Sequence, residues 1–231
     1  MARPIPPQKG IAAGNTVVGV DVGGQRKGFH AVALTDGQYA DRCATADVGK
    51  LVAWCRNVHA TVIAVDAPSR WSTDGRARLA ERQLMARGIW CFSTPTRKQA
   101  KERERQHSLG KATNHYGWML RGEELFQALE RTHPLCSGLP ASGQRCCFET
   151  FPHDITWHLT AGKADATRKR SQRRDLLEKA GIDLAKLTNI DLVDAALCAL
   201  AAQHFVSDGG KCLSYGEQDT GLIIVPKTLK P

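Results

Sequence analysis

The stretch Val17-Val18-Gly19-Val20-Asp21-Val22-Gly23-Gly24 decides the fold, because an apolar run that closes on a carboxylate and a double glycine predicts a buried strand and a turn. Residues 28–34 are apolar again and predict a second strand. After the turn signal Asp36-Gly37, residues 39–45 predict a third strand. The first part of the chain is therefore expected to form a three-stranded meander.

A second apolar run, Val62-Ile63-Ala64-Val65-Asp66, also ends on a carboxylate. Unbroken apolar runs of this length are typical of parallel strands that are buried on both faces. The segment before it, residues 48–58, has apolar side chains at helical spacing and predicts a crossover helix. A meander followed by a helix and a buried strand predicts a mixed sheet in an α/β fold.

The rest of the chain alternates predicted helices with short strands, and Pro152 is expected to end a strand over 145–151. The strongest helix is 191–205, whose alanines would let it lie close against a sheet. Helices are also predicted over 76–87, 117–129 and 167–180, and after Gly209-Gly210 a hairpin is predicted over 212–215 and 222–225. Because no linker divides the 231 residues, we expect a single domain over 16–231 behind an extended or disordered segment 1–15, with a five-stranded mixed sheet, a helical insertion and a C-terminal hairpin.

Isolated carboxylates at the ends of these elements are the main functional signal. Burying an unpaired carboxylate costs several kcal/mol, so a buried cluster of them favours a bound cation, and oxygen ligands favour Mg²⁺ or Mn²⁺. Four of them also have a structural interpretation: a turn residue for Asp21, an Asx turn for Asp66, an exposed strand position for Glu149, and a helix N-cap or a first-turn acid favoured by the helix dipole for Asp191. The candidates are Asp21, Asp66, Glu149 and Asp194 for catalysis, and Asp21, Asp66, Asp191 and Asp194 for metal binding.

The order of these motifs resembles an uncharacterised bacterial and archaeal family of predicted nucleases with a ribonuclease H-like (RNase H-like) fold. The resemblance runs from about Val17 to Pro226. It implies a sheet with Asp21 on the first strand and Asp66 on the fourth, and a last helix that supplies Asp194 with or without Asp191. The segments that carry it are Val18–Gly24, Val65–Pro68, Glu81-Arg82, Phe92–Pro95, Phe148–His153 and Asp191–Ala196.

The resemblance and the carboxylates together predict a metal-dependent nuclease with Mg²⁺ or Mn²⁺, and a two-metal site is possible. In such sites two ions about 4 Å apart hold the attacking water and the leaving oxygen of a phosphodiester. Glu149 is expected to be a fourth ligand or a base that orients water. Arg78, Glu81 and Arg82 also fall in a stretch that resembles the family. The two arginines could hold phosphates of the substrate, or the three residues could form helix-surface ion pairs.

The chain is basic, with 32 Lys and Arg against 23 acidic residues and a formal charge of +9. Much of the excess lies in the tracts 97–105 and 168–174. Clustered bases predict a nucleic-acid surface, although acids interleave with the first tract, which therefore also fits a solvated helix face. The candidate nucleic-acid-binding residues are Arg168, Lys169, Arg170, Arg173 and Arg174.

Eight scattered cysteines without an export signal predict reduced thiols. No stretch suggests a membrane span or a signal peptide, so we expect a cytoplasmic protein with no membrane partner. The chain has no Cys-x-x-Cys pair, which argues against zinc at the one group whose residue types would suit it. That group is His133, Cys136, Cys146, Cys147, His153 and His158.

Two other function classes stay open at this stage. Gly19–Gly28 resembles the first phosphate-binding hairpin of actin-like ATPases and sugar kinases, although the duplicated half of that superfamily is missing. A nucleic-acid-binding module with an inactive carboxylate site would have nearly the same sequence. Metal-dependent cleavage would separate the nuclease from the binding module, and ATP hydrolysis would identify the ATPase.

Overall fold

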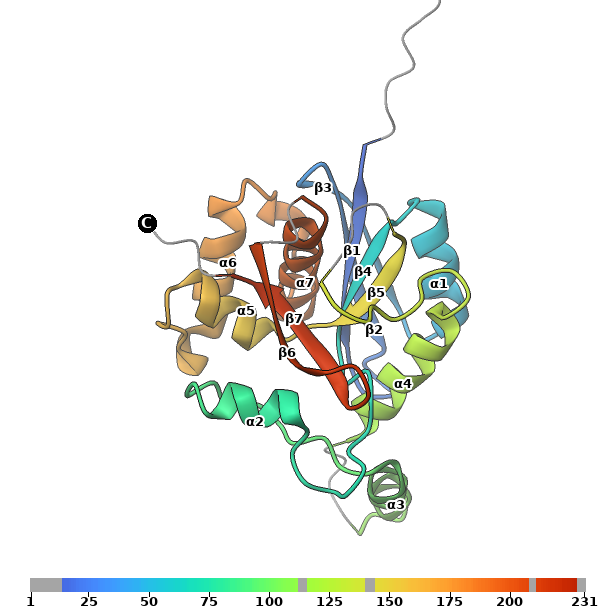
Figure 1. The fold of residues 1–231 in the computed structure, drawn as a ribbon. Coiled ribbons are helices and arrows are strands. Elements are labelled where there is room, and N and C mark those ends of the chain that lie inside the picture. Colours follow the sequence, from blue (N-terminus) through green and yellow to red (C-terminus); the bar gives the residue numbers. More distant parts are fainter. Residues whose placement is uncertain (1–13, 112–115, 140–143, 208–210, 228–231) are drawn as a thin grey trace, which may run out of the picture.

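The computed structural model describes residues 14–111, 116–139, 144–207 and 211–227, and they form a mixed α/β fold around one sheet (Figure 1). The sheet has seven strands in the order β3-β2-β1-β4-β5-β7-β6. The strands are β1 Thr16–Val22, β2 Phe29–Thr35, β3 Gln38–Thr45, β4 Val62–Asp66, β5 Cys146–Glu149, β6 Cys212–Glu217 and β7 Gly221–Pro226. Residues 1–13 of the predicted N-terminal segment, and Gly209 with Gly210, lie outside the described residues.

The strand pairing confirms the predicted meander, because β1, β2 and β3 are antiparallel neighbours. Strand β4 runs parallel to β1, and β5 runs parallel to β4. The C-terminal hairpin of β6 and β7 joins the same sheet through the pair Glu149 and Ile223. The prediction of five strands was therefore wrong, since the contact between β5 and β7 joins residues far apart in the chain.

Helices cover both faces of the sheet (Figure 1). Helix α7 packs on β1, β2 and β4, with α5 and α6 beside it, whereas α1 and α4 cover the opposite face. The helices are α1 Val48–Asn57, α2 Leu79–Met85, α3 Arg97–Ser108, α4 Gly117–Leu129, α5 Pro152–Leu159, α6 Lys169–Lys179 and α7 Ile190–Ser207, with short 3₁₀ turns at Ala166–Arg168 and Leu184–Lys186.

The close approach of α7 to the sheet depends on small residues on both sides. A Cβ atom added to Gly19 would lie 2.0 Å from the Ala199 nitrogen and 2.1 Å from the Ala195 oxygen, which no side chain tolerates. The prediction that the alanines of this helix allow close packing is confirmed. This contact places the start of α7 beside the end of β1.

Helix α7 also meets the length and composition of a membrane span, with 18 residues and a mean hydropathy of 1.3, but 67% of it is buried inside the protein. Its apolar character is therefore explained by its place in the core. The described residues form an α/β domain that gives no indication of a membrane protein.

Two helices differ from the sequence prediction. Helix α2 begins only at Leu79, because Arg78 has an extended backbone and its nitrogen donates a 2.9 Å hydrogen bond to the Glu81 side chain. Helix α5 was missed, because Pro152 was expected only to end a strand. Proline is favoured in the first turn of a helix, and here it begins α5 directly after β5.

Candidate metal centre

Two of the predicted carboxylates lie side by side at the carboxyl edge of the sheet. Asp21 on β1 is the register partner of Asp66 on β4. Alternation along β1 turns Asp21 to the same face as Gly19, which is the face that α7 covers. Asp66 follows Val62 and Ala64 on that face of β4. The strands thus direct both carboxylates toward the start of α7.

Helix α7 adds Asp191 and Asp194 from its first two turns. The helix is capped by Asn189, whose side-chain oxygen accepts a 2.9 Å hydrogen bond from the Leu192 nitrogen. Asp191 is therefore not the N-cap but an acid of the first turn, the other structural interpretation, and it forms a 2.5 Å ion pair with Lys27. Asp194 is buried and forms a 2.5 Å ion pair with Arg173 of α6.

The charges of this cluster are incompletely balanced. Burial, and then the charge of Asp194, raise the pKa of Asp21 to about 7, although Lys27 opposes the shift. Burial and the charges of Asp21 and Asp194 raise the pKa of Asp66 well above its ordinary value. Burial also raises the pKa of Asp194, against the effect of Arg173. One oxygen of Asp21 is buried without a hydrogen-bond partner, so the site has acceptor capacity that the described protein groups do not use.

His30 joins the cluster and was missed by the sequence analysis. It is the register partner of Asp21 on β2, and its Nδ1 atom is buried without a hydrogen-bond partner. Ligand atoms of Asp21, His30 and Asp191 all lie within 4.8 Å of one another. Burial lowers the pKa of His30, which favours the neutral imidazole that metals bind. Only the hairpin register could have revealed this residue.

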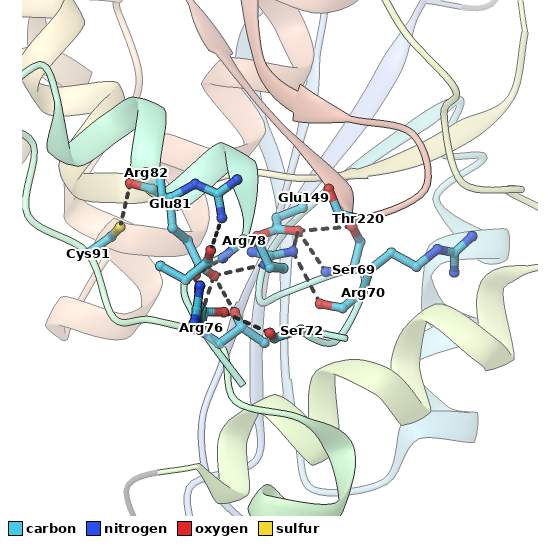
Figure 2. A network of polar contacts seen from close by, with 12 residues as sticks. Ser69, Arg70, Ser72, Arg76, Arg78, Glu81, Arg82, Cys91, Glu149 and Thr220 are labelled. Carbon is cyan, nitrogen blue, oxygen red and sulfur yellow. Dashed lines mark hydrogen bonds and ion pairs between the residues drawn. The ribbon is translucent and has the colours of Figure 1, made fainter. Parts of the chain in front are cut away.

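Glu149 lies at the same edge, in register with Val65 of β4, but its carboxylate is already fully engaged (Figure 2). The two terminal nitrogens of Arg78 donate to it at 2.9 and 2.6 Å. The Ser69 nitrogen and hydroxyl donate at 2.7 and 2.9 Å. The structure thus brings Glu149 near Asp66 but gives it an arginine partner that Asp66 does not have.

Arg78 connects Glu149 to a second buried acid, Glu81. Its Nε atom donates to Glu81 at 2.8 Å (Figure 2). Glu81 also accepts hydrogen bonds from the backbone and hydroxyl of Thr94. Arg78 is 4% exposed and Glu81 is 1% exposed. The alternative of a helix-surface ion pair was therefore wrong for Arg78. A charged side chain in the core cannot be recognised from local sequence.

A small pocket of about 40 Å³ lies between the two groups of acids. Asp66 and Glu149 both line it, together with Phe92 and Trp118. The pocket opens the Asp66 side of the cluster toward the loop that joins α2 to α3.

The basic tract divides into two parts. Arg168, Lys169 and Arg170 are exposed at the start of α6. Arg173 instead faces inward to Asp194, and Arg174 donates to the Leu187 carbonyl oxygen at 3.1 Å. Exposed cations thus lie one to two helical turns from an arginine that contacts the carboxylate cluster.

Two alternatives from the sequence find less support in the geometry. Among the described residues, Asp21, His30 and Asp191 form the one metal-type group, so the cysteine and histidine set is not assembled as a zinc site. The Nε2 atom of His133, for example, forms a hydrogen bond with the Ala60 carbonyl oxygen. The second alternative is the phosphate-binding hairpin of an actin-like ATPase, at the turn between β1 and β2. There the backbone nitrogens of Gly23 and Gly28 donate to carbonyl oxygens of the turn itself, so they are not available to a phosphate.

Comparison with known proteins gives one match, a family model described as "Protein of unknown function (DUF429)" that covers residues 19–220. The chain belongs to the DUF429 family. The candidate site lies within the matched region, which includes the cluster carboxylates, His30 and the Arg78 network. No curated protein and no solved structure matched.

Proposed function

We propose that this DUF429 protein is a metal-dependent nuclease that hydrolyses phosphodiester bonds of DNA or RNA. The observation that carries the proposal is the register pairing of Asp21 with Asp66 beside Asp194, with the pKa of Asp21 raised to about 7 and one of its oxygens unpartnered. Strongly perturbed carboxylates that share one edge of a sheet are typical of functional sites.

The sheet order supports an RNase H-like arrangement, which the sequence resemblance implies. Strands β3-β2-β1-β4-β5 form an antiparallel meander followed by parallel strands, with Asp21 at the end of the first strand and Asp66 at the end of the fourth. Helix α7 crosses these strands and brings Asp194 to the same edge. In this proposal the hairpin of β6 and β7 extends that core.

The donor set fits Mg²⁺ or Mn²⁺. Asp21 and Asp191 would supply hard oxygen ligands, and His30 adds a nitrogen that Mn²⁺ accepts more readily than Mg²⁺. Asp66, the register partner of Asp21, and Asp194 lie outside that group of three and would complete the ligand set. When bound, such ions lower the pKa of a water molecule and stabilise the charge of the leaving oxygen.

The protein's own residues would bind and orient the substrate. Lys27 is half exposed beside Asp191, and Arg173 contacts Asp194, so both cations lie where a phosphate would approach the carboxylates. The Nδ1 atom of His30 is buried without a hydrogen-bond partner, and burial lowers the pKa of the ring, which favours the neutral form. Where His30 does not ligate the metal, its free ring nitrogen would accept a proton from water. Arg168, Lys169 and Arg170 would contact the backbone farther from the cut.

The proposed location is the cytoplasm, where thiols are reduced. All eight cysteines are free, and Cys55, Cys146, Cys147, Cys198 and Cys212 are buried.

The decisive experiment measures metal binding and cleavage separately. Mn²⁺ binding is followed by calorimetry, and cleavage of labelled DNA and RNA is followed with Mg²⁺ or Mn²⁺ and with EDTA. We expect Asp66→Asn to lose both binding and cleavage, whereas Asp175→Asn, on the exposed side of α6, keeps both. Metal-independent cleavage, or cleavage retained in Asp66→Asn, would contradict the proposal.

One observation favours a second candidate, a nucleic-acid-binding module without catalysis. Asp191 and Asp194 already have Lys27 and Arg173 as partners, so protein cations neutralise half of the cluster. In that case the wild-type protein would bind oligonucleotides equally well with Mn²⁺ and with EDTA, and would cleave none of them.

A further inference from the structure

Two aromatic side chains stand out of the loop that joins α2 to α3. Trp90 is 80% exposed and Phe92 is 67% exposed, the largest exposures of large apolar side chains among the described residues. Ile89 is fully buried and Cys91 is half-buried, so the loop has an inner side that packs and an outer side that carries the aromatics. Neighbouring exposed aromatics on a water-facing loop are typical of a binding surface.

The base of this loop is held in place by the buried ion-pair network. Thr94 donates to Glu81 through its backbone and its hydroxyl. Arg78 joins Glu81 to Glu149 at the end of β5 (Figure 2). Two rings on a loop with a fixed base lose little conformational freedom when a ligand covers them.

The loop lies between the candidate metal centre and a basic helix. Phe92 lines the same pocket as Asp66. The loop then leads into α3, where Lys98 and Lys101 line a groove together with Arg97 and Arg105. Arg97 and Arg105 have acidic partners in Glu123 and Glu102, which leaves the two lysines as the less compensated charges of that groove.

We propose that Trp90 and Phe92 stack on unpaired bases of single-stranded nucleic acid, whose phosphates run along α3. Every base offers a π face to an aromatic ring when it is unpaired, whereas a duplex hides that face between neighbouring base pairs. The inference rests on the proposed function and names its substrate class: a strand that is single-stranded where it passes the pocket beside Asp66.

The test compares single-stranded and duplex oligonucleotides of one sequence by fluorescence anisotropy, with EDTA present so that no cleavage occurs. Trp90→Ala and Phe92→Ala should each weaken single-strand binding about fivefold or more, since stacking on one base contributes about 1–3 kcal/mol. Trp90→Tyr should retain most of the affinity. Leu139→Ala, an exposed apolar side chain outside this loop, is the matched control and should bind as the wild type does.

Three results would overturn the proposal. The first is unchanged single-strand affinity in both alanine variants, and the second is an equal loss of affinity for the single strand and for the duplex. The third is that the wild-type protein binds anionic phospholipid vesicles and that Trp90→Ala abolishes this binding. The outcome is separable from that of the proposed function. Aromatic-dependent binding without cleavage would leave this inference standing and remove the nuclease, whereas cleavage with binding that does not depend on the aromatics would do the reverse.

Discussion

Two groups of acids meet at the carboxyl edge of the sheet, and they differ in how their charge is balanced. In the Arg78 network, Glu81 and Glu149 share one buried arginine and also receive hydrogen bonds from Thr94 and Ser69. Both carboxylates therefore have hydrogen-bond donors and a cationic partner within the protein.

In the candidate metal centre, the four carboxylates of Asp21, Asp66, Asp191 and Asp194 have two cations near them, Lys27 and Arg173. The pKa of Asp21 is raised to about 7, and Asp66 shifts in the same direction. A buried carboxylate whose charge is balanced by an arginine and by hydrogen bonds can remain in the core without a metal. A buried carboxylate without enough such partners is stabilised by a bound cation. Under the proposed function, the first group is structural and the second binds the metal.

The largest expected effect separates the two groups through metal binding. Asp21→Asn should abolish divalent-dependent cleavage and the rise in melting temperature that Mn²⁺ causes, because it removes a ligand. Glu149→Gln should keep the Mn²⁺-induced rise, although its own melting temperature is lower. Thermal melts with and without Mn²⁺ measure both, and a Glu149→Gln protein that no longer responds to Mn²⁺ would return Glu149 to the ligand set.

The next effect concerns stability. Arg78→Met should destabilise the protein by about 3–5 kcal/mol, because it leaves Glu81 and Glu149 buried without their cation. Urea unfolding followed by circular dichroism measures the change. Arg105→Met, which breaks the exposed pair with Glu102 on α3, is the control and should unfold as the wild type does. Similar midpoints for the two variants would refute a structural role for the network.

A smaller effect follows from the raised pKa of Asp21. The folded protein holds this proton up to about pH 7, whereas the unfolded chain releases it near the ordinary value of 3.8. The folded state therefore binds more protons between these values, and its stability falls as the pH rises through this window. Without metal, Asp21→Asn should flatten that fall in a series of urea unfolding curves. A steeper fall in the variant would show that Asp21 is stabilised as the charged form.

The smallest expected effect is on the salt dependence of duplex DNA binding. Replacing Arg168, Lys169 and Arg170 by Gln should reduce the slope of log affinity against log salt by about 0.9 for each lost phosphate contact. Asp194→Asn should leave the slope nearly unchanged, because it removes a ligand and no phosphate contact. A salt series for both variants decides this, and an unchanged slope in the triple variant would make the tract a solvated helix face.

The sequence by itself determined the elements that carry the cluster. Apolar runs that end in Asp21 and Asp66 predicted two buried strands, because a continuous apolar stretch is stable only between covered faces. The alanines after Asp194 predicted a helix that packs closely, which the contact with Gly19 confirms. These signals are local, since each follows from the spacing of a few neighbouring residues.

Only the tertiary structure decided which polar groups meet. His30 reaches Asp21 through the register of β1 and β2, and Arg78 reaches Glu149 across 71 positions of the chain. The place of β7 beside β5 and the outward turn of Trp90 also depend on packing between distant segments. Local sequence encodes the period and burial of an element, but the pairing of charges depends on distances that exist only after the elements have packed.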